Sequence, residues 1–270
     1  MAKYNKKRVK ELQHDRFRDT TMTLFDRLGN ALEGRGRQIL YGLGGLLVVG
    51  LLILFFVKRS DQKADEAREA IGRAITISTA NVGAPMFGAQ SSAQTFNNEM
   101  ERSQRAIEEF EKVAAKYGDP YQAEARYFIA SNRLIIDRPK AITELTELSN
   151  SSVAEVAALS KFALAQAKES DNKLDEAAQL YSDLAKLNGP TISQETANLR
   201  LAKVYEKQGK KKEAADLLFN IVDASRKAKG DDGQPAPTSA AAREAATELK
   251  KLDPDRYAQL PPEAPPSLVG

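Results

Sequence analysis

A pattern of apolar and small residues recurs at a spacing of 37 residues in the second half of this 270-residue chain. The matching pairs are Leu164 and Leu201, Ala165 and Ala202, Glu176 and Glu213, Ala177 and Ala214, Tyr181 and Leu218, and Leu184 and Ile221. Stacked helical hairpins bury a continuous core only if the same positions recur in each unit. The spacing therefore predicts a solenoid of paired helices.

Segments with the apolar period of a helix follow one another from Phe96 onward, and no strand pattern intervenes. Short breaks rich in Gly, Pro or polar residues separate them, at 117–120, 136–139, 148–152, 169–173, 188–191 and 208–211. Asp137 before Pro139 is typical of a helix start, because proline is tolerated in the first turn. The predicted fold class is all-α.

The recurring positions resemble the tetratricopeptide repeat. That repeat places a large apolar and a small residue in its first helix, an Ala at the start of its second, then an aromatic and another apolar residue. Small residues such as Ala165 and Ala177 let paired helices approach closely. The same scheme recurs upstream, at Ile129, Ala130, Ala141, Leu145 and Leu148, and in a second helix with Ala106, Phe110 and Val113.

The repeat domain is expected over 96–252, and its last helix should be a cap. One face of that helix is apolar or small, with Ala242, Ala245, Ala246, Leu249 and Leu252, and the other is polar. An open-ended stack needs such a solvated end. Residues 253–270 form a predicted Pro-rich tail, whose last ten residues should be extended, with partner binding as a minor alternative.

Residues 39–57 form a run of 19 residues without a charge. A helix of this length, at ~1.5 Å per residue, spans the ~30 Å hydrocarbon core of a bilayer. A cleavable signal peptide is the alternative, but its apolar region should be only about 7–15 residues long and end in small residues. Here 38 residues precede the run and KRSDQK follows it. We therefore predict one N-terminal transmembrane helix.

The charges that flank this helix give a mixed indication of its orientation. Residues 1–38 carry ten Lys and Arg against five acidic residues, which favours a basic cytoplasmic tail attracted to anionic lipid. A long C-terminal segment translocates largely regardless of charge. We expect a single-pass protein of the cytoplasmic (inner) membrane, with its repeat domain in the periplasm or outside. No nucleic-acid partner is expected.

Residues 58–95 are expected to be a degenerate first helix followed by a long loop. Gly83, Pro85 and Gly88 break the helical pattern, and loops of this length are often functional or disordered. Met86 and Phe87 are its candidate contact residues. A merely mobile loop is the alternative.

In tetratricopeptide domains the first helices line a concave groove. The matching positions are Tyr127, Ser131, Phe162, Gln166, Leu199 and Lys203. Relatives that clamp a peptide carboxylate use Lys and Asn there, and this sequence does not follow that pattern. The hypothesis is therefore a groove for an apolar or amphipathic segment. The alternative is that the chain's own loop or cap covers these side chains.

The residues that common catalytic sites need are missing from the sequence. It has no Cys, its one His is His14 in the tail, and no glycine-rich phosphate loop follows a strand. No metal-ligand spacing is present either. We expect no enzyme activity, no cofactor and no metal site. The oligomeric state does not follow from the sequence.

The order of a cytoplasmic tail, one span and an extracytoplasmic repeat domain with a cap is similar to the YfgM-like family of ancillary Sec translocon subunits. This resemblance implies protein partners: the translocon, periplasmic chaperones or newly secreted clients. The longer tail, the 80–94 insertion and the Pro-rich end depart from that family. A structural scaffold in cell-envelope assembly or division complexes is the alternative.

Overall fold

The computed structural model describes residues 58–59, 61–83, 95–187, 189–230 and 233–263, and the chain divides into two compact units, Met1–Asp65 and Glu66–Gly270. The predicted tail 1–38 and transmembrane helix 39–57 lie outside the described residues. Among the residues that are described, no helix is long and apolar enough to cross a membrane. In the first unit, the described residues 58–59 and 61–65 are helical.

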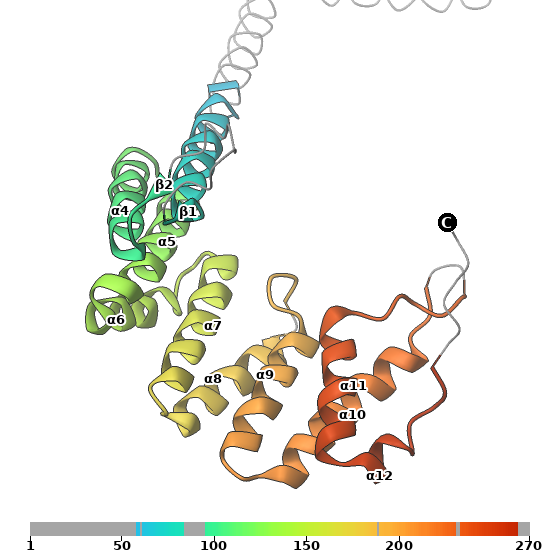
Figure 1. Cartoon of the computed structure of the whole chain (residues 1–270). Helices are drawn as coiled ribbons and strands as arrows, with labels where there is room; N and C mark the ends of the chain where they lie inside the picture. The colour runs from blue at the N-terminus through green and yellow to red at the C-terminus, as the bar shows by residue number, and fades with distance from the viewer. Residues whose placement is uncertain (1–57, 60, 84–94, 188, 231–232, 264–270) are drawn as a thin grey trace, which may run out of the picture. The chain divides into compact units, whose positions relative to one another are not determined.

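The described part of the second unit is mostly helical (Figure 1). After the helical residues 66–78, the end of a helix that begins at residue 61, come α4 (Glu99–Lys116), α5 (Tyr121–Ile136), α6 (Arg138–Leu148), α7 (Ala154–Ser170), α8 (Leu174–Leu187), α9 (Gln194–Lys207), α10 (Lys211–Lys227), α11 (Ala240–Leu252) and α12 (Pro254–Tyr257). All six predicted breaks coincide with junctions between successive helices. The predicted helix start is also confirmed, because Asp137 Oδ1 accepts a hydrogen bond from the Lys140 amide at 3.2 Å.

Consecutive helices pack against each other as hairpins, α5 with α6, α7 with α8 and α9 with α10, and each hairpin packs against the next. The alanines of the repeat are at most 1% exposed: Ala130, Ala141, Ala165, Ala177, Ala202 and Ala214. Tyr181 and Leu218, one repeat apart, are fully or almost fully buried. The positions that recur in the sequence are therefore the core of the stack, and the predicted hairpin repeat is confirmed.

Two of the hairpin turns share one backbone geometry at the same spacing of 37 residues. Asn172 and Gly209 both have positive φ angles, 58° and 76°. In each turn the next amide, of Lys173 or Lys210, donates at 2.8 Å to the carbonyl five residues earlier. This left-handed closure ends the first helix and satisfies one of its last carbonyls. The repeat thus includes its turn as well as its core.

The predicted degenerate first helix is a regular helix over 61–78. Its Ile71 and Ala74 are buried and share a core cluster with Phe110 of α4 and Ile129 of α5. A feature missed by the sequence analysis follows it, a parallel pair of two-residue strands, β1 (Asn81–Val82) and β2 (Thr95–Phe96). Two residues are too few to show a strand period in the sequence.

The predicted cap is confirmed, because Ala242, Ala245 and Leu249 of α11 are at most 1% exposed and lie in one cluster with residues of α9 and α10. The first part of the predicted Pro-rich tail is ordered and packs against the cap. Asp253 caps α12, and Leu260, 8% exposed, packs into the same cluster as α11. The burial of Leu260 was not predicted, because the segment around it is rich in proline and has no apolar period. Residues 264–270 lie outside the described residues.

The turn geometry predicts that alanine substitution at two glycines changes the free energy of unfolding in opposite directions. Gly209→Ala should lower the free energy of unfolding by about 1–2 kcal/mol, because a Cβ disfavours the left-handed backbone. Gly72 lies within the helix 61–78 with no atom near its hypothetical Cβ, so Gly72→Ala should raise it by up to about 1 kcal/mol. Chemical denaturation of the two full-length variants, followed by circular dichroism, measures both. Shifts of the same sign would contradict the turn assignment.

Candidate protein-binding surface

Three of the six predicted groove residues come together between α5 and α7. Tyr127 and Ser131 of α5 and Gln166 of α7 line one depression of about 300 Å³. Its other lining residues are Leu134, Arg138, Ala163, Ala167 and Ser170. The first helices of two successive hairpins, which contact each other, therefore supply one joint surface.

This α5–α7 depression has almost no uncompensated charge. Arg138 is the one charged residue that lines it, and its Nε donates to Asp171 Oδ1 at 2.8 Å. Ser131 Oγ is buried and makes no hydrogen bond within the described part of the chain. The Tyr127 ring lies edge-on to Phe128, with centroids 5.3 Å apart. An aromatic ring, small side chains and a compensated Arg138 suit an uncharged segment of a partner better than a charged one.

Phe162 does not line the α5–α7 depression. Its ring meets the buried Tyr181 edge-on at 5.7 Å, with 68° between the ring planes. It packs against the core cluster of α7, α8 and α9. Phe162 is therefore chiefly a packing residue of the α7–α8 hairpin.

The two predicted groove positions on α9 are covered by the cap. Leu199 is 4% exposed and lies in the same cluster as Ala245 and Leu249 of α11. Lys203 Nζ forms an ion pair with Glu244 of α11. The alternative of cover by the chain's own cap thus holds for α9, and Leu199 is not available to a partner while α11 is docked. Met86 and Phe87 lie outside the described residues, so their contact role stays a prediction.

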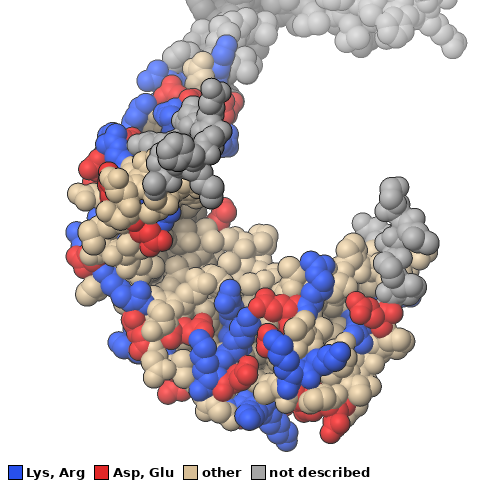
Figure 2. Space-filling view, viewed as in Figure 1, with Lys and Arg blue, Asp and Glu red and all other residues tan. Residues whose placement is uncertain are grey.

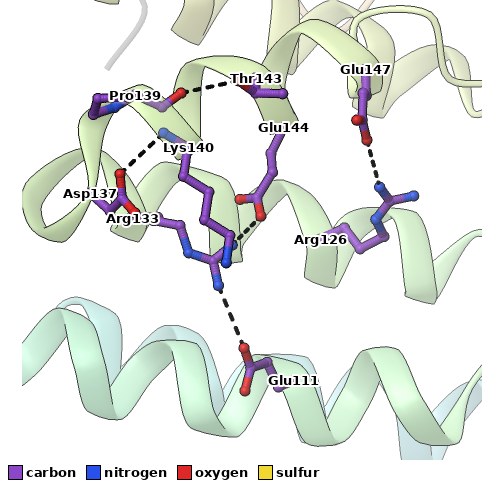
Figure 3. A network of polar contacts seen from close by, with 9 residues as sticks. All are labelled: Glu111, Arg126, Arg133, Asp137, Pro139, Lys140, Thr143, Glu144 and Glu147. Atoms are coloured by element: carbon purple, nitrogen blue, oxygen red, sulfur yellow. Dashed lines mark hydrogen bonds and ion pairs between the residues drawn. The ribbon is translucent and has the colours of Figure 1, made fainter.

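A second depression, of about 230 Å³, lies where α4, α5 and α6 meet, and its main charges pair with one another (Figure 3). Arg133 of α5, whose side chain is 13% exposed, pairs with Glu144 of α6 and lies 3.5 Å from Glu111 of α4. Arg126 pairs with Glu147 at 3.3 Å on the surface. The guanidinium of Arg133 therefore joins three helices. Sequence analysis missed this network, because partners 11 and 22 residues apart show no pattern.

Tyr181 has a satisfied hydroxyl in the core of the stack. The hydroxyl donates to Glu169 Oε2 at 3.2 Å, and Lys207 Nζ pairs with the other oxygen of that carboxylate at 2.5 Å. Burial, followed by the negative charge of Glu169, raises the pKa of Tyr181. The phenol therefore stays protonated and serves packing rather than acid–base chemistry.

The face of the molecule drawn in Figure 2 carries both positive and negative side chains. Figure 2 shows Lys and Arg interleaved with Asp and Glu over α8, α9 and α10 on the face in view. Across the described ranges, no group of three His, Cys, Asp or Glu side chains could hold a metal ion. His14 lies outside those ranges. The expected absence of catalytic residues, cofactors, metals and nucleic-acid partners stays a prediction.

No family model matches the chain, and no curated protein matches it. Among solved structures, the chain is similar to one from Podospora anserina described as a candidate kinesin light chain with nearly identical TPR-like repeats. The identity is 18% over 56% of this chain and 77% of that one, with a TM-score of 0.44. A likeness of this degree does not define the fold. The fold is defined instead by the recurring core positions and turns, which are those of a helical-hairpin repeat.

The Arg133 network gives a test of stability. Arg133→Met leaves the Glu144 carboxylate half-buried without its cation and should lower the free energy of unfolding by about 1–3 kcal/mol. Arg126→Met is the matched control, because an exposed pair contributes less than about 1 kcal/mol. Adding Glu144→Leu to Arg133→Met should restore part of the loss. Equal losses of unfolding free energy for the two single variants would contradict the conclusion that Arg133 stabilises the packing of α4, α5 and α6.

The cap gives a test of pH dependence. A hydrogen bond from Lys203 lowers the pKa of Glu244, and the positive charge of Lys203 adds to this. The stabilisation from Glu244 is therefore complete above its ordinary pKa of about 4.3 and is lost as pH falls through the lowered value. Hydrogen exchange of α11 amides should show this loss in the unmodified chain and less of it in Glu244→Gln. An unchanged pH profile in the variant would contradict it.

Proposed function

We propose that this protein is a membrane-anchored scaffold that binds other proteins through the α5–α7 depression. The observation that carries the proposal is that Tyr127, Ser131 and Gln166, from two successive first helices, line one open surface. The corresponding surface of α9 is filled by the chain's own helix α11. Repeat proteins bind partners on surfaces that several units form together. The lack of uncompensated charge favours an apolar or amphipathic segment as the bound element.

The anchor in this proposal is the uncharged run 39–57, which is long enough to span a bilayer. The basic tail 1–38 favours a cytoplasmic amino terminus, which would put the repeat unit in the periplasm or outside. Protease added to right-side-out membrane vesicles should then digest residues 61–270. Full protection of those residues would contradict both the localisation and an extracytoplasmic role.

The finer proposal is an ancillary translocon subunit, or an adaptor of a chaperone network, for newly secreted proteins. It is supported by the resemblance to the YfgM-like family in the order of tail, span, hairpin repeats and cap. A scaffold of envelope assembly or division has the same parts. The two differ in their partners, which would change with secretion in the first case and stay fixed in the second.

Site-specific photocrosslinking in intact cells separates these roles. A crosslinker at Gln166, which is exposed on the rim of the depression, should capture translocon subunits, chaperones or secreted chains. A crosslinker at the exposed Thr143 of α6, which does not line the depression, is the control. Tyr127→Ala should reduce capture at least fivefold, and Tyr127→Phe much less.

A partner set that does not change when secretion is blocked would favour the envelope scaffold instead. Equal capture from Gln166 and Thr143 would contradict binding at the depression. The crosslinking result does not depend on the vesicle result, so the surface and the localisation are tested separately.

A further inference from the structure

A hollow of about 500 Å³ runs along α11 at the end of the repeat stack. It is lined by Arg243, Ala246, Thr247, Lys250, Lys251, Tyr257 and Glu263. The lining residues that belong to α11 are not the same as Ala242, Ala245 and Leu249, which are buried against the α9–α10 hairpin. The hollow therefore lies on a stripe of α11 that the repeat core leaves open.

The helix α12, which follows α11 and would complete a further hairpin with it, is short. The first helices α5, α7 and α9 are each followed by a second helix, of 11, 14 and 17 residues. The cap α11 occupies the next place in this order, and α12 after it has 4 residues. Among the residues that the structure describes, no second helix therefore runs along most of α11. A helix from a partner could pack there in the way that α6, α8 and α10 pack.

The charges along the hollow are mostly positive and poorly compensated. Within the described part of the chain, Arg243 and Lys250 form no ion pair. Arg243 donates to the Thr238 carbonyl at 2.7 Å, and Lys250 Nζ lies 5.9 Å from the centre of the Tyr257 ring. A third cation, Lys251, pairs with Glu248 at 3.2 Å, and Glu263 is the one acidic lining residue. Arg243 and Lys250 are seven positions apart, about two helical turns or roughly 10 Å.

We propose that this hollow binds an acidic helix of a partner protein. Two carboxylates about two turns apart on that helix would face Arg243 and Lys250, while small or apolar side chains lie over Ala246 and Thr247. Charge complementarity favours this occupant. A second copy of the chain would bring two basic hollows together, and a lipid surface would find no large aliphatic lining residue to insert. This surface is distinct from the α5–α7 depression and does not depend on its role.

The test is photocrosslinking from Thr247, an exposed lining residue, in the full chain in intact cells, with Thr143 as the control position. Mapping of the crosslinked peptides by mass spectrometry should place the contact in a helical segment with acidic residues about seven apart. Arg243→Glu with Lys250→Glu should reduce the yield at least tenfold. The matched control, Lys211→Glu with Lys212→Glu, reverses two exposed charges at the start of α10 and should leave the yield unchanged.

Replacing the two mapped partner carboxylates by Lys should restore crosslinking to the Arg243→Glu, Lys250→Glu variant, which a folding defect could not allow. Crosslinks to lipid, to a second copy, or to a segment without acidic pairs would overturn the inference, as would the absence of crosslinks. Tyr127→Ala should leave capture from Thr247 unchanged. Failure of one surface can therefore be told from failure of the other.

Discussion

Close approach of paired helices at alanine positions is the contact on which the repeat unit depends. Ala165, Ala177, Ala202 and Ala214 are at most 1% exposed, and small side chains at a contact let two helices pack closely. Tyr181 then fills the space that remains between neighbouring helices. Because each hairpin packs against the next, the successive first helices α5 and α7 contact each other. The depression between α5 and α7 is a consequence of that stacking.

The Arg133 network, the α5–α7 depression and the hollow along α11 differ in how their charges are compensated. This difference distinguishes a network that stabilises the fold from surfaces that could bind a partner. Around Arg133 the charges of three helices largely neutralise one another within the chain, so the network serves stability. The α5–α7 depression has a compensated Arg138 and an unused Ser131 hydroxyl. The hollow along α11 has Arg243 and Lys250 without an acidic partner in the described residues. Two open surfaces of different chemistry suit two different partners, which agrees with the proposed scaffold role.

Much of the fold could be predicted from the sequence, because helical packing leaves a periodic record. The buried alanines and the cap face follow from spacing, and the hairpin boundaries, with the break at Gly209, follow from the Gly, Pro and polar residues between the periodic segments. The pairing of β1 with β2 left no such record, since two residues show no period. Leu260 was missed for a similar reason, because one apolar side chain in a Pro-rich segment has no pattern.

The sequence by itself determined which residues of the hairpin repeat are core, since burial against a helix neighbour requires apolar or small residues at helical spacing. It also placed Tyr127, Ser131, Phe162, Gln166, Leu199 and Lys203 at first-helix positions where a groove could form. Only the tertiary structure decided which of them remain accessible. Leu199 lies under α11 and Phe162 packs on Tyr181, whereas Tyr127, Ser131 and Gln166 line an open depression. Accessibility depends on which distant helix packs above a position, and local spacing carries no information about that.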